Sequence, residues 1–200
     1  MAGDTLIAAG FSDPVFQSQN AFRALLAALS EPGARQEIAR ETPAPDGLDG
    51  AAATVLLTLA DYETPIWLAP ALRIGAAGAW LRFHCGAALV DDPASASFAV
   101  IDGSAHGPLL AEFNPGHDQF PDRSTTVIVS CVAFEGGAGV TLSGPGIAGT
   151  RSLAPRGLRP GFWAEVAANA DLYPLGVDLI LSCGEALIGL PRTTRIAETI

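Results

Sequence analysis

Residues 177–190 have the sequence VDLILSCGEALIGL, in which two apolar runs are separated by a short polar segment. The runs at 177–182 and 187–190 have the length of β-strands, and the glycine within 183–185 suits a tight hairpin turn. Both runs are apolar almost throughout instead of alternating, which is typical of strands covered on both faces. We therefore predict a buried hairpin near the end of the chain.

Further short runs outside this hairpin also predict strands. The run at 125–134 is rich in β-branched residues, and the glycines within 135–137 predict a second hairpin that returns through 139–143. The other predicted strands are 66–68, 81–84 and 97–102.

Three helices are predicted between these strands. Asp13 can cap the first helix and Pro14 can begin it, and it ends near Ser30. The second helix, at 51–60, is apolar on nearly all sides, which indicates deep burial. The third covers about 159–169, and the predicted loops are 42–50 and 103–122, the latter with a short helix. Together these elements predict one α/β domain over residues 1–200, with a mixed sheet flanked by helices.

The composition excludes several classes of chemistry. The chain has 49% hydrophobic and 16% charged residues, a formal net charge of −10, and eleven basic residues that are all arginines. Without lysine, neither a Schiff base with pyridoxal phosphate (PLP) nor a Walker A loop can form, so we predict no PLP cofactor. An acidic chain without a basic cluster is a poor candidate for binding nucleic acid. No uncharged apolar run reaches about 18 residues, so no membrane span is predicted.

Cysteine and histidine spacing gives no catalytic or metal-binding pattern. Cys85, Cys131 and Cys183 are single and widely separated, which argues against a disulfide framework or a zinc site. The three histidines also lack ligand spacing, so no metal is predicted. The first ten residues have no basic segment of the kind that opens a signal peptide, and a cytoplasmic location is predicted.

Arg192, Thr193, Thr194 and Arg195 directly follow the last predicted strand. Two guanidinium groups and two hydroxyls can bind a phosphate, a phosphonate or a carboxylate. They can equally pair with carboxylates of this chain or of a neighbouring protein. The sequence leaves both interpretations open.

Arg82 and His84 lie two residues apart in a predicted strand, which places them on one face. Together they can bind an anion or move a proton. A buried pair of Arg82 with Asp61 or Asp178 explains the pattern as well. Asp178 itself interrupts an apolar run, and a buried carboxylate needs a partner.

Several segments, in order from about residue 14 to 195, resemble the PhnH subunit of bacterial carbon–phosphorus lyase. The first predicted helix carries part of the resemblance, including Ser18, Gln19 and Arg23. Thr54 and Tyr173 depart from it, because serine and phenylalanine are expected there. The other matching segments are 55–61, 64–68, 81–84, 173–181 and 190–194.

The resemblance implies a subunit of the carbon–phosphorus lyase core complex in phosphonate catabolism, beside PhnG, PhnI and PhnJ. It implies that the chain supports the formation of alpha-D-ribose 1-alkylphosphonate 5-triphosphate from ATP and an alkylphosphonate. It further implies that the chain is not catalytic in isolation, and it assigns no catalytic residue. It also implies a homodimer in isolation, and a fold like the large domain of PLP-dependent transferases without the cofactor.

Three functions follow as hypotheses from these observations. The first is an assembly subunit, for which Ser18, Gln19 and Arg23 are candidate interface residues. The second is a subunit that contributes side chains to a site completed by a partner. The third is a stand-alone binder of a small anionic ligand, a nucleotide or a phosphonate, on a degenerate PLP-transferase-like fold.

Overall fold

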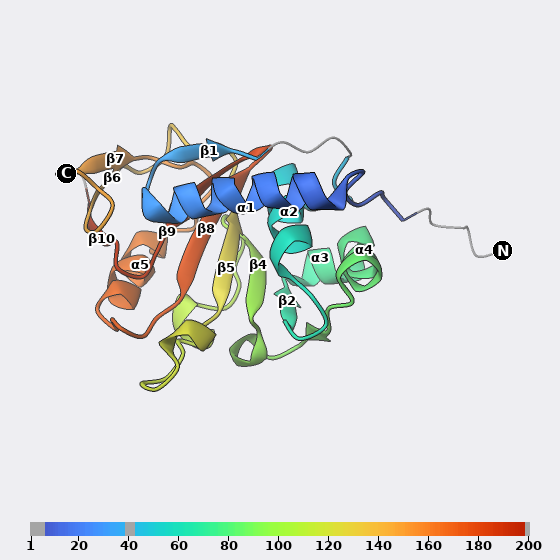
Figure 1. Cartoon of the computed structure of the whole chain (residues 1–200). Coiled ribbons are helices and arrows are strands. Elements are labelled where there is room, and N and C mark those ends of the chain that lie inside the picture. Colours follow the sequence, from blue (N-terminus) through green and yellow to red (C-terminus); the bar gives the residue numbers. More distant parts are fainter. Residues whose placement is uncertain (1–6, 39–42, 199–200) are drawn as a thin grey trace.

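The computed structural model describes residues 7–38 and 43–198 (Figure 1). Within them, a seven-stranded sheet has the order β1-β9-β8-β5-β4-β2-β3. The five strands from β3 to β8 run parallel, and β9 and β1 continue the sheet antiparallel, which confirms the mixed sheet. Its strands are β1 (Arg35–Glu37), β2 (Ile66–Leu68), β3 (Leu89–Val90), β4 (Phe98–Asp102), β5 (Thr126–Ser130), β8 (Asp178–Cys183) and β9 (Ala186–Leu190).

The hairpin predicted at 177–190 is confirmed as β8 and β9. Cys183 is paired with Ala186, so Gly184 and Glu185 form a two-residue turn, and Gly184 has the positive φ of +61° that such turns favour. Both strands are almost entirely buried. Gly189 permits close packing on one face, because a Cβ there would lie 2.6 Å from the carbonyl oxygen of Ala28 in the first helix.

Helices cover one face of the sheet, and α1 forms an outer layer across it (Figure 1). Val100, Ile128 and Ile180 share a core with side chains of α1, α2 and α4 on this face. Asp13 caps α1 as predicted, accepting from the Phe16 amide at 3.2 Å. The helices are α1 (Pro14–Ser30), α2 (Gly50–Leu59), α3 (Pro70–Ile74) and α4 (Ala76–Cys85).

The opposite face carries a second core. The residues that follow Val100 and Ile128 on their strands, Ile101 and Val129, pack there with Phe162 and Leu142. This is expected, because successive side chains of a strand point to opposite faces of the sheet. This layer contains α5 (Phe162–Ala170) and a small sheet, in the order β10-β6-β7, formed by β6 (Val140–Ser143), β7 (Arg151–Leu153) and β10 (Arg195–Glu198).

One predicted strand and one predicted hairpin are wrong. Residues 81–84 belong to helix α4, because the alanine-rich start favours a helix and buried Ala77, Trp80 and Leu81 recur at helical spacing. The predicted hairpin from 125–134 to 139–143 also does not form. Both edges of β5 are occupied by the parallel strands β4 and β8, so the chain leaves the sheet after Ser130 and β6 pairs in the small sheet instead.

The other predictions fit with shifted ends. The helix expected at 159–169 begins at Phe162, after the left-handed residue Gly161. The helix at 51–60 is observed as α2 and is buried, and 103–122 is a loop with short 3₁₀ turns. Thr42 of the predicted loop 42–50 lies outside the described residues. Among the residues described, no helix is long and apolar enough to cross a membrane.

The strand order creates a reversal point between β2 and β4. From β2 the chain moves outward to β3, then returns past β2 to β4, β5 and β8. Numbered along the chain, these parallel strands have the order 2-1-3-4-5, which is that of doubly wound ligand-binding folds. In such sheets ligands bind beyond the carboxyl ends of the strands, at the reversal point.

Candidate functional site

The amino edge of the sheet holds an arginine–aspartate pair. Asp178 begins β8, in register with the first residues of β4 and β5, and Arg192 follows β9. Nε and Nη2 of Arg192 donate to the two carboxylate oxygens of Asp178 at 3.1 and 2.6 Å, and the Arg192 amide donates to Oδ1 at 2.9 Å. The partner of Asp178 is therefore Arg192, and its suggested pairing with Arg82 is wrong.

Arg192 has no hydrogen-bond donor left for a ligand. Nη1 donates to the carbonyl oxygens of Pro121 and Pro174 at 2.8 and 3.4 Å, and Nη2 donates to the Ser124 hydroxyl as well as to Asp178. With Nε, these bonds use all five N–H groups of the guanidinium. A ligand could bind Arg192 only by breaking one of these hydrogen bonds. This arginine therefore stabilises the loops at the amino edge.

The neighbouring candidates are dispersed. Arg195 forms an exposed ion pair with Asp171 at 3.2 Å. Thr194 is buried, and its Oγ1 has no hydrogen-bond partner among the described residues. Thr193 is half-buried and lines a shallow depression of about 280 Å³ together with Arg192. The four residues therefore do not converge on one point.

Arg82 and His84 do not share a face, because residues two apart in a helix project about 200° from each other. Arg82 is exposed and has no ion pair within the described part of the chain. His84 Nε2 lies 2.9 Å from the carbonyl oxygen of Ala8 and therefore acts as the donor. These two residues do not form a shared anion or proton-transfer site.

Helix α1 presents an apolar face outward. Ala21, Leu25 and Ala28 face the core, and the opposite side of the helix carries exposed large side chains. Gln19 and Arg23 are exposed beside them, and Ser18 is half-buried, with its hydroxyl bonded to the carbonyl of Pro14. The exposed apolar residues are Val15, Phe16, Phe22 and Leu26, which are 75%, 66%, 47% and 52% exposed.

A row of polar residues at the carboxyl edge was missed by sequence reasoning. Asp102, Ser130 and Ser182 are aligned across β4, β5 and β8 at or near the ends of these strands. The Ser182 hydroxyl donates to Oδ2 of Asp49 at 2.8 Å, while Oδ1 of Asp49 caps α2 by accepting from the Ala52 amide at 2.7 Å. The sequence contains a signal for this row, because the apolar runs of β4, β5 and β8 are each followed by Asp or Ser.

Burial raises the pKa of one carboxyl group and of two thiols. It raises the pKa of Asp49 above its ordinary value of 3.8, against hydrogen bonds from Ala52, Ser182 and Ser130. Burial also raises the pKa of Cys131 to about 12 and that of Cys85 to about 11. Both thiols are therefore protonated at neutral pH and lack the thiolate that nucleophilic catalysis requires.

Arg159 is buried, and its environment differs from that of Arg192. Its side chain is 7% exposed and forms an ion pair with Glu165, with Nη2 to Oε2 at 2.7 Å. Nε also donates to Glu165, and Nη2 donates to the Pro108 carbonyl at 3.2 Å. Nη1 is buried and has no hydrogen-bond partner among the described residues. Two N–H groups of this guanidinium are therefore unused.

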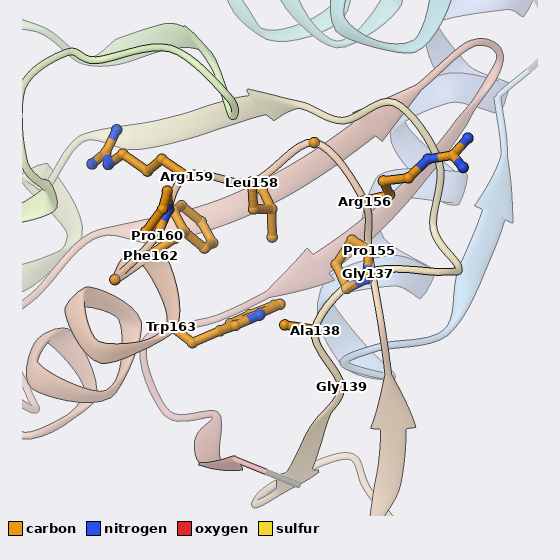
Figure 2. A pocket seen from close by; sticks show the side chains of 12 residues that line it. Gly137, Ala138, Gly139, Pro155, Arg156, Leu158, Arg159, Pro160, Phe162 and Trp163 are labelled. Atoms are coloured by element: carbon orange, nitrogen blue, oxygen red, sulfur yellow. The ribbon is translucent and has the colours of Figure 1, made fainter. Parts of the chain in front are cut away.

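Arg159 lines two pockets. One, of about 550 Å³, lies between the loop 137–139 and the start of α5 (Figure 2). Figure 2 shows Trp163 facing Ala138 there, whereas the guanidinium of Arg159 points away from them. The other pocket, of about 520 Å³, lies at the carboxyl edge and is also lined by Asp102 and Ser130. The first is also lined by Arg156 beside backbone and apolar surface, and the second combines apolar walls with Asp102, Ser130 and Arg159.

Histidine, cysteine and acidic side chains do not assemble into a metal centre within the described ranges, where no group of three or more of them is suitably placed. His106 lines the carboxyl-edge pocket and is exposed. His117 pairs with Phe120 in a short loop bridge, far along the chain from His84. The residues described therefore offer ionic and hydrogen-bonding groups rather than a metal site.

The fold and these side chains define an open-sheet α/β protein with the strand order of doubly wound ligand-binding folds. The polar groups described above lie at the two edges of the sheet.

The chain belongs to the PhnH family, because residues 9–197 match the family model described as bacterial phosphonate metabolism protein (PhnH). Two relatives agree. The chain is 38% identical over 195 residues to alpha-D-ribose 1-methylphosphonate 5-triphosphate synthase subunit PhnH of Rhizobium meliloti (strain 1021), covering 98% of each chain. It is 35% identical over 182 residues to the putative C-P lyase subunit protein HtxG of Stutzerimonas stutzeri, covering 90% of this chain and 86% of the relative.

Proposed function

We propose that this protein is a subunit of the complex that forms alpha-D-ribose 1-alkylphosphonate 5-triphosphate from ATP and an alkylphosphonate in the cytoplasm. Its partners would be homologues of PhnG, PhnI and PhnJ, and the isolated chain would form a homodimer. The observation that carries the proposal is the match along nearly the whole chain to a relative named as a subunit of that synthase. The relative named as a putative C-P lyase subunit supports the same conclusion.

The exposed face of α1 supports an assembly role. Val15, Gln19, Phe22 and Leu26 recur at intervals of four, three and four residues, which places them in one line along the helix. Burying a large apolar side chain that is otherwise exposed contributes about 1.5–3 kcal/mol. On a protein surface that faces water, contiguous apolar surface of this kind is typical of protein–protein contact sites.

The charge of α1 indicates what kind of partner surface would bind this helix. Arg23 is the one charged residue within α1, on a chain whose formal net charge is −10. The face of α1 is therefore apolar with a single cation, and it suits a partner surface that is apolar with an acidic group at its rim.

Co-expression with the PhnG, PhnI and PhnJ homologues tests the role. We expect the tagged chain to recover all three, and we expect Phe22→Asp to abolish this recovery while the chain still folds, because Phe22 is 47% exposed and lies outside the buried core. Ile74→Asp is the matched control, since Ile74 is 88% exposed on α3, and it should leave recovery intact. Recovery of no partner by the unaltered chain would overturn the proposed function, and normal recovery by Phe22→Asp would remove α1 as the contact.

The structure adds no support for an anion site at the amino edge, because every donor of Arg192 is already bonded. A binding function of the single chain would depend on the carboxyl edge instead.

A further inference from the structure

The pocket at the carboxyl edge lies at the reversal point of the strand order. One side is formed by the segment after β2, including Pro70 and Leu72, and the other by the segment after β4, including Asp102 and Pro108. Ligands of open parallel sheets bind at this position. A volume of about 520 Å³ also lies within the range of small-molecule sites.

Three polar side chains converge on this pocket. Asp102 is exposed, and its Oδ1 accepts from the amide and hydroxyl of Ser104, which leaves Oδ2 without a partner among the described residues. Ser130 lies beside Asp102 on the neighbouring strand. Arg159 is more than nine-tenths buried, and its Nη1 lacks an acceptor within the described chain. The pocket thus presents one free carboxylate oxygen and one hydroxyl, and the unsatisfied donor of Arg159 is buried in its wall.

The charge of these groups disfavours an anion. Glu165 neutralises Arg159 through bonds to Nε and Nη2, so Asp102 gives the pocket a net negative charge. A phosphate or phosphonate would lie near this carboxylate without a free cation among the lining arginines. A neutral ligand with hydroxyl groups fits better, because it can donate to Asp102 and accept from Arg159 at the same time.

The apolar walls of the pocket further limit the class of ligand that it can bind. Trp67, Leu72 and Ile101 line the pocket beside the polar groups, which suits a ligand with one flat apolar part and one hydroxylated part. A carboxylate at the carboxyl end of a parallel strand that binds a ribose diol is the arrangement found in nucleotide-binding sheets.

We infer that the carboxyl-edge pocket binds the ribonucleoside part of a nucleotide, with the ribose diol on Asp102 and a ribose or base oxygen or nitrogen as the acceptor for Arg159. The choice of a ribonucleoside rests on the proposed function, because ribose and triphosphate occur in the name of the relative's product. The phosphates point outward, where the chain itself supplies no neutralising arginine. The isolated chain therefore binds adenosine at least as tightly as ATP and does not bind methylphosphonate.

Calorimetric titration of the isolated full-length chain with adenosine, ATP and methylphosphonate tests this assignment. We expect saturable binding of adenosine, and at least about tenfold weaker binding by Asp102→Asn, because a charge-assisted hydrogen bond is lost. Asp92→Asn is the matched control. Asp92 holds a similar turn, accepting from Ala94 and Ser95 at 3.1 Å each, but it does not line the pocket.

Three results would overturn the assignment. They are no heat with adenosine, equal binding by the Asp102→Asn and Asp92→Asn variants, and binding of methylphosphonate in place of adenosine. Thermal melting of both variants verifies that they fold. Recovery of the PhnG, PhnI and PhnJ homologues is measured in parallel, so a chain that assembles normally but binds no adenosine removes the pocket and leaves the proposed function standing.

Discussion

Two arginine–carboxylate pairs lie at opposite edges of the same sheet, and they differ in how completely the arginine is bonded. At the amino edge, Arg192 uses all five N–H groups, on Asp178, Ser124 and two carbonyls. At the carboxyl edge, Arg159 bonds Glu165 and one carbonyl, and its Nη1 has no partner among the described residues. A fully bonded arginine stabilises loops, whereas an incompletely bonded one beside a pocket is available to a ligand.

The difference also follows the chain topology. Asp178 begins β8, so the Arg192 pair lies at the amino end of the parallel strands. Arg159 lies after β7 and reaches the segment that follows β4, at the end where parallel strands leave a crevice. The sequence shows that an arginine and a carboxylate are present, but their function can be inferred only when the edge of the sheet at which they lie is known.

Removal of Arg192 should have the largest effect. Arg192→Met leaves Asp178 partly buried without its cation, and we expect a loss of about 3 kcal/mol in the free energy of unfolding, measured by urea denaturation. Arg195→Met is the control, because both members of its ion pair are more than 60% exposed and the expected change is within about 0.5 kcal/mol. Equal effects of the two substitutions would refute the structural role of Arg192.

Arg159→Met should cost less, about 2 kcal/mol, because it also removes a buried donor that has no acceptor. Adding Glu165→Gln should recover part of the loss, since the lone carboxylate is then neutral. The same urea titrations measure both. If Arg159→Met proves as costly as Arg192→Met, the unused Nη1 carries no energetic cost and the contrast between the edges fails.

Asp49 should give the smallest effect, visible as a dependence on pH. Burial raises its pKa in the folded state above 3.8, so the folded chain holds this proton more tightly than the unfolded chain. The resulting stabilisation is complete below the unfolded pKa and is lost as the pH rises through the raised folded value. Asp49→Asn keeps an acceptor for the Ala52 amide and should lack this component. Melting curves of both proteins from pH 4 to 8 that remain parallel would contradict the raised pKa.

Strands and helices could be predicted where one local pattern dominated. The β8–β9 hairpin and the cap of α1 followed from apolar runs, a glycine turn and an aspartate–proline pair. Residues 81–84 were mistaken for a strand because four alternating residues carry too little signal against the helix-forming alanines before them. The partner of β6 could not be predicted, because it depends on which edges of β5 are occupied.

The candidate site was harder to predict than the fold. Asp178 was correctly recognised as needing a partner, and Arg192 was recognised as a candidate binder, but their bond to each other depends on the sheet register and a loop. Asp102, Ser130 and Arg159 lie on three separate segments, and only the strand order brings them to one pocket. The exposed face of α1 could not be predicted, because the side that faces the core is set by small residues such as Ala21 and Ala28.

Amide chemical shifts of the isotopically labelled chain, followed during titration with adenosine, test most directly which edge of the sheet binds a ligand. The account predicts shifts at Asp102, His106, Ser130 and Arg159, and no change at Arg192, Thr193 and Thr194. Shifts confined to residues 192–194, or shifts caused by methylphosphonate in place of adenosine, would contradict it.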